Sequence, residues 1–380
     1  MASPAQPLRF LCRSCRKGVH NLSKPSRSFS TTSQRSKSIP HFAPSASPEL
    51  DQLLSTFREK VFMPAALSQQ HRALIYKRSK DAYITAEPGV TVTMSDEEEI
   101  TLKPMDYFDK PSLRGSLSTF VEILNQHSDH ATWSNLVPFL QGLALAKCNV
   151  PSWFYQKITR KGCEVGKESL IIRCVENSRD THVRLSIPGV ARELYVSLYK
   201  RAMEAGLEGP QLDSAYSRAE KLALLLEDEE HCGGKLTLYS KDKKQFDVDA
   251  RADPAILNIL LLLSASKAAQ VEPADEELNK KVVGYIRKVV YAVNHPPQIE
   301  TVFSSYDVSK PPGKAALLEE AIFGKSAVEQ ALKLELDQEL KEKLQQASEV
   351  LKTRISELEP VVREQAAGRP RRALELYDQA

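Results

Sequence analysis

Apolar residues recur at three- and four-residue steps along most of the chain, which is the period of an amphipathic α-helix. The pattern begins at Leu50 and dominates from residue 113 onward. It predicts successive helices at 113–127, 133–147, 152–161, 167–177, 190–205, 212–230, 254–270, 274–294, 314–332 and 337–359. Capping signals support several ends: Asp253 precedes Pro254 at one start, and Gly206 follows another helix. The sequence therefore predicts an all-α protein.

The N-terminal part of this pattern contains one interruption. Helices are predicted at 50–62, between Pro48 and Pro64, and at 65–77. Residues 82–108 instead alternate β-branched and polar side chains around an acidic run. We expect either a small β-hairpin or a disordered acidic loop inserted between helices. The extended segments are predicted at Tyr83–Thr85, Val90–Met94 and Ile100–Leu102.

Two helix ends have the same spacing of residues. Tyr155 to Gly162 matches Tyr199 to Gly206, 44 residues later, and each glycine leads into another helix. Residues 191–210 resemble the second helix and exit turn of tetratricopeptide or pentatricopeptide-type repeats, over about 129–230. The resemblance implies an irregular, α-solenoid-like stack of helical hairpins. The spacing departs from the 34 residues typical of those repeats, so it implies no RNA-reading residues. The alternative is an irregular helical domain with chance similarity at two helix ends.

The first 48 residues contain eight Lys and Arg and no Asp or Glu. This composition is typical of a mitochondrial presequence. Arg27, followed by Phe29 and a run of Ser and Thr, resembles a two-step matrix-processing site. We expect cleavage of residues 1–36 and a Pro-rich linker at 37–48. The alternative is a disordered basic tail that binds nucleic acid.

Removing the predicted presequence reverses the net charge of the chain. The full chain has 52 Lys and Arg against 49 Asp and Glu, a formal charge of +3. Residues 1–36 carry seven of the positive charges, so the remainder has 45 against 49 and a charge of −4. A mildly acidic body does not favour a uniform basic surface for nucleic acid, although it leaves room for local basic patches.

Sequence signals for membrane insertion and catalysis are absent. The apolar run Ala255–Leu263 is far shorter than the roughly 20 residues that a membrane span requires. No Gly-x-Ser-x-Gly or Gly-rich strand-to-helix motif is present. Residues 162–168 resemble a phosphate loop but have the wrong glycine spacing. Neither Cys nor His residues have metal-site spacing: His127, His130 and the His231-Cys232 pair are interpreted as loop residues. We predict no enzyme, cofactor or metal.

Basic residues beside aromatic rings provide a candidate contact with RNA or a partner. Trp153, Phe154 and Tyr155 precede one cluster, and Tyr195 and Tyr199 precede the other. Rings can stack on bases while cations bind phosphates. The alternative is that the rings form the core while the cations extend to solvent. The candidate contact residues are Lys157, Arg160, Lys161, Lys200 and Arg201.

The C-terminal region contains an apolar stripe that could bind a partner helix. Its residues follow steps of 4-4-3-4-4-3, an eleven-residue period that gives a nearly straight stripe. Pro360 is expected to end the helix, and Arg369 to Arg372 supply a small basic patch behind it. The alternative is a helix that packs on its own domain. The stripe consists of Leu336, Leu340, Leu344, Ala347, Leu351, Ile355 and Leu358.

These observations give a predicted organisation of presequence 1–36, linker 37–48, N-terminal helices with the insertion 49–112, repeat-like domain 113–310 and long C-terminal helices 311–380. The first functional hypothesis is a non-enzymatic gene-expression factor of the mitochondrial matrix, bound to the mitochondrial ribosome or to a transcript. The alternative is an assembly or scaffold factor that binds only protein subunits of a respiratory-chain complex. The sequence supplies no prediction of oligomeric state.

Overall fold

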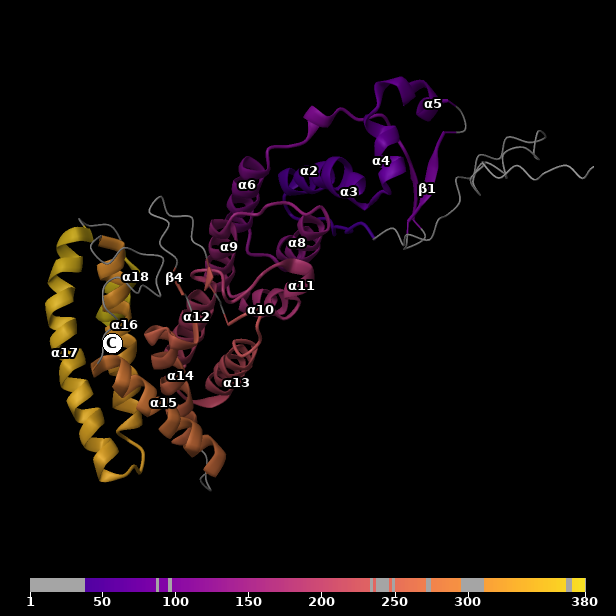
Figure 1. Ribbon diagram of the computed structural model, residues 1–380. Helices are drawn as coiled ribbons and strands as arrows, with labels where there is room; N and C mark the ends of the chain where they lie inside the picture. Colours follow the sequence, from indigo (N-terminus) through magenta and orange to yellow (C-terminus); the bar gives the residue numbers. More distant parts are fainter. Residues whose placement is uncertain are drawn as a thin grey trace, which may run out of the picture. The chain divides into compact units, whose positions relative to one another are not determined.

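The computed structural model describes residues 38–86, 89–94, 98–232, 235–236, 246–247, 250–270, 275–294, 311–366 and 371–379. The predicted presequence lies outside these residues. The chain divides into two compact units, shown with their helices in Figure 1. Unit 1 contains Glu59–Lys110 together with the residues before Pro40, and unit 2 contains Pro40–Arg58 and Pro111–Ala380.

Unit 1 combines short helices with one β-hairpin. Its hairpin is antiparallel, with Thr91 opposite Thr101 and Thr93 opposite Glu99. Val92 and Leu102 are buried while their neighbours Thr91 and Thr101 are exposed, as the alternation in the sequence requires. The elements are α3 (Met63–Ala66), α4 (Gln69–Tyr76), the 3₁₀ turn η2 (Arg78–Lys80), α5 (Asp81–Thr85), β1 (Thr91–Thr93), β2 (Glu99–Thr101) and the 3₁₀ turn η3 (Tyr107–Asp109).

The β-hairpin confirms one of the two interpretations of 82–108, but two local predictions nearby were wrong. Tyr83–Thr85 is helical rather than extended, because α5 places Ile84 in the core with only 2% of its surface exposed. Pro64 does not end the preceding helix. α2 (Pro48–Phe57) ends earlier and is followed by a π-helical turn, η1 (Arg58–Phe62). Pro64 then lies in the first turn of α3, where its missing N–H is not needed.

The N-terminal part of unit 2 is built around aromatic residues. Phe120 stacks on Phe139 at 4.2 Å between ring centroids, and Phe57 meets Phe139 edge-on at 5.3 Å. Asn135 and Ala43 exchange two hydrogen bonds of 2.9 and 2.8 Å, which anchor the chain before α2. The helices are α6 (Leu113–Gln126), α7 (His130–Ser134), α8 (Leu136–Leu145), α9 (Ser152–Glu164), α10 (Glu168–Glu176) and α11 (Ser178–Thr181).

The C-terminal part of unit 2 surrounds one buried helix, α14 (Pro254–Ala268). Every residue from Pro254 to Ser266 is buried, because α12, α13, α15 and α16 pack around it. Asp253 caps its start, accepting a hydrogen bond of 2.9 Å from the Ala255 N–H, as predicted. Long helices α16 and α17 pack side by side, and α18 packs on both (Figure 1). The remaining bounds are α12 (Val190–Glu204), α13 (Gly209–Leu225), β3 (Lys235–Leu236), β4 (Phe246–Asp247), η4 (Ala250–Ala252), α15 (Glu276–Asn294), α16 (Pro311–Ala331), α17 (Gln338–Ala366) and α18 (Arg372–Gln379).

The prediction that Pro360 ends the last long helix was wrong. α17 continues through Pro360 to Ala366. Proline in a helix interior loses one backbone hydrogen bond and strains the preceding turn. The next turns bury Val362 and Ala366 at 1% and 4% exposure. Tertiary packing of these apolar residues offsets the local cost of the proline.

One of the two helix ends predicted at a glycine lies at a different glycine. Gly162 does not stop α9 but lies inside it, where an added Cβ would come within 2.8 Å of Ile171. The left-handed residue is Gly166, with φ of 73°, and its counterpart Gly206 has φ of 69°. Each end is closed by two hydrogen bonds of the same pattern. At the first end the Gly166 N–H donates to Cys163 O and the Lys167 N–H to Gly162 O, and at the second the Gly206 N–H donates to Met203 O and the Leu207 N–H to Ala202 O. The two helix ends are therefore geometrically alike, but their true spacing is 40 residues.

None of the helices in the described ranges combines the length and apolar character needed to cross a membrane. The chain is all-α apart from its short β-hairpins.

Candidate functional site

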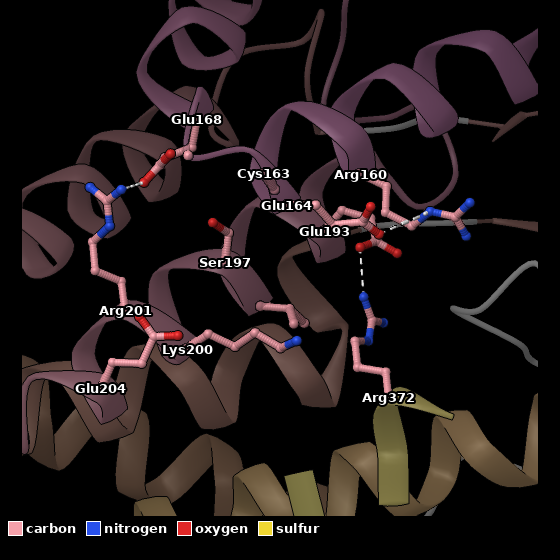
Figure 2. A pocket seen from close by; sticks show the side chains of 12 residues that line it. Arg160, Cys163, Glu164, Glu168, Glu193, Ser197, Lys200, Arg201, Glu204 and Arg372 are labelled. Atoms are coloured by element: carbon pink, nitrogen blue, oxygen red, sulfur yellow. Dashed lines mark hydrogen bonds and ion pairs between the residues drawn. The ribbon is translucent and has the colours of Figure 1, made fainter. Parts of the chain in front are cut away.

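A polar pocket of about 350 Å³ opens between α9, the start of α10, α12 and α18 (Figure 2). α9 and α12 turn their aromatic and aliphatic faces into the core, where Phe154, Ile158, Tyr195 and Tyr199 are buried. Their opposite faces carry charged side chains around the pocket. The lining residues are Arg160, Cys163, Glu164, Gly166, Glu168, Glu193, Val196, Ser197, Lys200, Arg201, Glu204 and Arg372.

The structure brings three of the five predicted basic residues to this pocket, namely Arg160 from α9 and Lys200 and Arg201 from α12. Lys157 is exposed one turn before Arg160, with its Nζ 5.1 Å from the centroid of the Trp153 ring. Lys161 bonds to Glu164 at 2.6 Å. The rings beside these cations mostly form the core, as the alternative interpretation of the clusters expected.

Carboxylates neutralise most of the positive charge at the pocket. Glu168, with 1% of its surface exposed, forms ion pairs with Arg201 and, at 3.4 Å, with Arg218. Glu164 is shared between Arg160 and Lys161. Lys200 differs, because no residue in the described part of the chain forms an ion pair with it.

Arg372 and Glu193, at one side of the pocket, belong to a largely buried charge cluster that we call the clasp: Arg372, Glu193, Glu319 and Arg192. Arg372 donates two hydrogen bonds of 2.9 Å to the Glu319 carboxylate and one of 2.6 Å to Glu193. Arg192 donates to the Ala316 carbonyl at 2.9 Å and lies 3.8 Å from Glu319. Figure 2 shows Arg372 reaching from α18 toward Glu193 on α12. The clasp therefore joins α12, α16 and α18.

Within the clasp, two arginines balance the charges of two glutamates. Burial lowers the pKa of Arg372, but its hydrogen bonds and charge contacts with Glu319 and Glu193 outweigh burial and raise that pKa overall. The side chains of Glu193 and Glu319 are at most 9% exposed, so loss of their partner would leave buried charge. Sequence reasoning placed Arg372 only in a basic patch. Its role depends on residues 53 and 179 positions away, which no local pattern reveals.

The pocket lacks an activated nucleophile in its described lining. Burial raises the pKa of the Cys163 thiol to about 12, which keeps it protonated and unreactive at neutral pH. Of the histidines interpreted as surface-loop residues, His130 is instead the first residue of α7, and His231 is buried at 3% exposure. Asp129, beside His130, caps α7 by accepting from the Thr132 N–H at 2.7 Å, and His231 accepts a hydrogen bond of 3.2 Å from the Leu185 N–H. Within the described residues, no group of three His, Cys, Asp or Glu could hold a metal ion.

The apolar stripe of α17 packs largely within unit 2. Leu344, Leu351 and Ile355 are at most 7% exposed, and α17 packs on α16 and α15. Leu336, Leu340 and Leu358 are half-buried. The centre of the stripe is therefore buried within its own domain. This is the alternative that the sequence left open to a contact with a partner helix.

Comparison with known proteins identifies the family. Residues 27–379 match the family model described as mitochondrial ribosomal protein mS27, which spans both units. The chain belongs to this family. It is 26% identical over 304 residues to the small ribosomal subunit protein mS27 of Neurospora crassa, covering 76% of this chain and 74% of the relative. Family membership confirms the prediction of a mitoribosome-associated gene-expression factor. The family matched is not a tetratricopeptide or pentatricopeptide repeat family.

Proposed function

We propose that this protein is a non-enzymatic component of the small subunit of the mitochondrial ribosome, located in the matrix. The observation that carries the proposal is the match to the mS27 family over residues 27–379. The relative from Neurospora crassa is named a small ribosomal subunit protein and aligns over about three quarters of each chain. A helical scaffold with a buried charged clasp and a polar pocket is compatible with a structural role, whereas a buried, protonated Cys163 offers no catalytic group.

We further propose that the open cations of α9 and α12 contact ribosomal RNA. Lys157 and Arg160 are exposed on α9, and Lys200 on α12 lines the same pocket as Arg160. Cations that retain hydration and lack a tight internal partner can bind phosphate with little competition. Lys161 and Arg201 instead hold Glu164 and Glu168, so their first role is to shape the pocket.

The test of the function is sedimentation of the tagged full chain from gently lysed mitochondria, with and without RNase. Comigration with the small ribosomal subunit, lost after RNase, is the expected result. A position with inner-membrane complexes that RNase does not change would overturn the proposal in favour of a respiratory-complex assembly factor. The double variant Arg160→Glu/Lys200→Glu is expected to shift protein from the subunit to free fractions. Lys280→Glu on α15, an 80% exposed cation outside the pocket, is the matched control.

Two finer assignments belong to the same proposal. We propose that residues 1–36 are removed on import, which N-terminal sequencing of the mature chain would show as a start near Lys37. A start at Met1 or Ala2 would contradict it. We also propose that residues 129–230 share the hairpin geometry of tetratricopeptide-type repeats, which the matching closing bonds at Gly166 and Gly206 support.

A further inference from the structure

The surface of unit 1 presents two aromatic rings to solvent. Phe108 is 90% exposed and Tyr107 is 63% exposed. Among the described residues of this unit, these are the large hydrophobic side chains that remain exposed. Exposing a whole phenylalanine ring forgoes the favourable free energy of its burial. Such a ring is a candidate contact for a binding partner.

The backbone around the two rings is held in place. Both rings lie in the turn η3, whose preceding residue Asp106 accepts a hydrogen bond of 3.0 Å from the Phe108 N–H. The Met105 N–H donates to the Ile75 carbonyl at 2.8 Å, which places this segment beside the end of α4. The Tyr107 ring meets Tyr76 edge-on at 5.8 Å between centroids. The geometry of the turn is therefore set before any partner binds.

Cations accompany the rings. The Lys110 Nζ lies 4.3 Å from the centroid of Tyr107 and 5.3 Å from that of Tyr76, within the range of a cation–π contact. The Arg78 side chain is 91% exposed and lies 3.4 Å from Asp106. The segments 76–81 and 103–110 together carry five exposed cations and three acidic residues. The cations are Lys77, Arg78, Lys80, Lys103 and Lys110.

This combination fits an unpaired RNA segment better than an apolar protein surface. Bases of any sequence can stack on an exposed aromatic ring, while neighbouring cations bind the phosphates. A protein hot spot is instead a packed centre enclosed by other contact residues. Here the rings lie at the tip of a turn among charged side chains, and no apolar neighbours among the described residues enclose Phe108 and exclude water from it, given its 90% exposure.

We propose that Phe108 and Tyr107, with Lys110 and Arg78, form a stacking platform for an unpaired segment of RNA. We call these four residues the ring platform. Phe108 receives a base on its open ring, and Lys110 and Arg78 neutralise the adjacent phosphates. This inference rests on the proposed function, because a ribosomal subunit supplies the RNA.

The test is ultraviolet cross-linking followed by mass spectrometry of gradient-purified small subunits that contain the tagged full chain. A nucleotide adduct on the peptide that contains Tyr107 and Phe108 is the expected result. A chain that sediments with the subunit but carries no adduct on this peptide would overturn the ring platform and leave the proposed function intact. If the chain does not sediment with the subunit, the proposed function fails. In that case the cross-linking is repeated on recombinant full chain mixed with a single-stranded RNA oligonucleotide. A nucleotide adduct on the same peptide would support the ring platform, and its absence would overturn it.

Variants at Phe108 separate stacking from a simple apolar contact. Phe108→Ala is expected to lower the affinity of the recombinant full chain for the oligonucleotide by about fivefold or more, because it removes one base stack. Phe108→Trp should retain affinity and Phe108→Leu should not. Tyr291→Ala, which removes a 66% exposed ring in unit 2, is the matched control. If leucine supports binding as well as phenylalanine does, or if no Phe108 variant changes RNA affinity, the platform assignment is wrong.

Discussion

The clasp and the open pocket cations contain the same residue types in different surroundings. The clasp arginine is paired with buried carboxylates, whereas the pocket cations remain open to water. In the clasp, Arg372 contacts Glu193 and Glu319, which are nearly inaccessible to solvent. In the same pocket, Arg160 is exposed and Lys200 is half-buried, so both retain access to water. The cost of leaving a charge unpaired is high where the charge is buried and low where water can replace the partner. The burial of the acidic partners, rather than residue type, therefore separates a cation that holds the fold from cations that remain open to water.

The largest test of this difference is removal of Arg372, the arginine that contacts both buried carboxylates. Arg372→Ala should lower the free energy of unfolding by about 3–5 kcal/mol, because Glu193 loses its arginine and Glu319 keeps only the longer contact with Arg192. Urea unfolding followed by circular dichroism would measure it. Arg363→Ala on α17 removes an exposed arginine that also has two acidic partners, Glu359 and Asp378, and should leave the midpoint unchanged. Equal effects of the two variants would abolish the distinction between clasp and surface.

An intermediate effect is expected at Glu168, whose carboxylate is buried but whose partners are partly hydrated. Arg201 and Arg218 have side-chain exposures of 33% and 29%. Glu168→Gln should destabilise the protein by about 1–2 kcal/mol, since the arginines can recover some hydration. Glu176→Gln on the same helix, which removes the partner of the exposed Lys221, is the control. An effect at Glu168 as large as that at Arg372 would show that partner hydration does not matter.

Two neighbouring glutamates on α16, one in the clasp and one outside it, predict a difference in how stability depends on pH. Glu319 is in the clasp, whereas burial raises the pKa of its neighbour Glu320 to about 7, with Arg192 lowering it and Asp253 raising it. A raised carboxyl pKa means that the folded state binds more protons than the unfolded state. Stability contributed by this group is therefore lost as pH rises from about 4.5 to 7. Glu320→Gln should flatten that decline and stabilise the protein above pH 7 relative to the native chain. Thermal midpoints across pH 5 to 8 would show it, and a variant that tracks the native profile would contradict it.

The smallest effect on stability is expected at Lys200. Lys200→Ala removes a cation that has no ion-pair partner in the described structure, so unfolding should change by less than about 0.5 kcal/mol. The same variant should reduce the fraction of the chain that sediments with the small subunit. A stability loss comparable to that of Glu168→Gln would place Lys200 among the structural cations instead.

Local sequence signals predicted most helices, but not all of their boundaries or the contacts that the helices make with one another. Asp253 and Gly206 were placed correctly as caps, because capping depends on residues a few positions apart. Pro64 and Pro360 were misplaced as helix boundaries, since packing of the residues after them outweighs the local preference. Gly162 was interpreted as a helix stop, whereas its role is to let α9 approach Ile171. That role depends on a contact between helices, which the local pattern does not encode.

The sequence by itself determined the helical class and the order of most helices, because both follow from periodicity within a short window. It also identified Arg160, Lys200 and Arg201, three cations that line one pocket. Only the tertiary structure decided that Arg201 pairs with Glu168, that Lys200 has no ion-pair partner among the described residues and that Arg372 joins three helices. The physical reason is that the free energy of a charge depends on its burial and its partners, and both are set by residues distant in the chain.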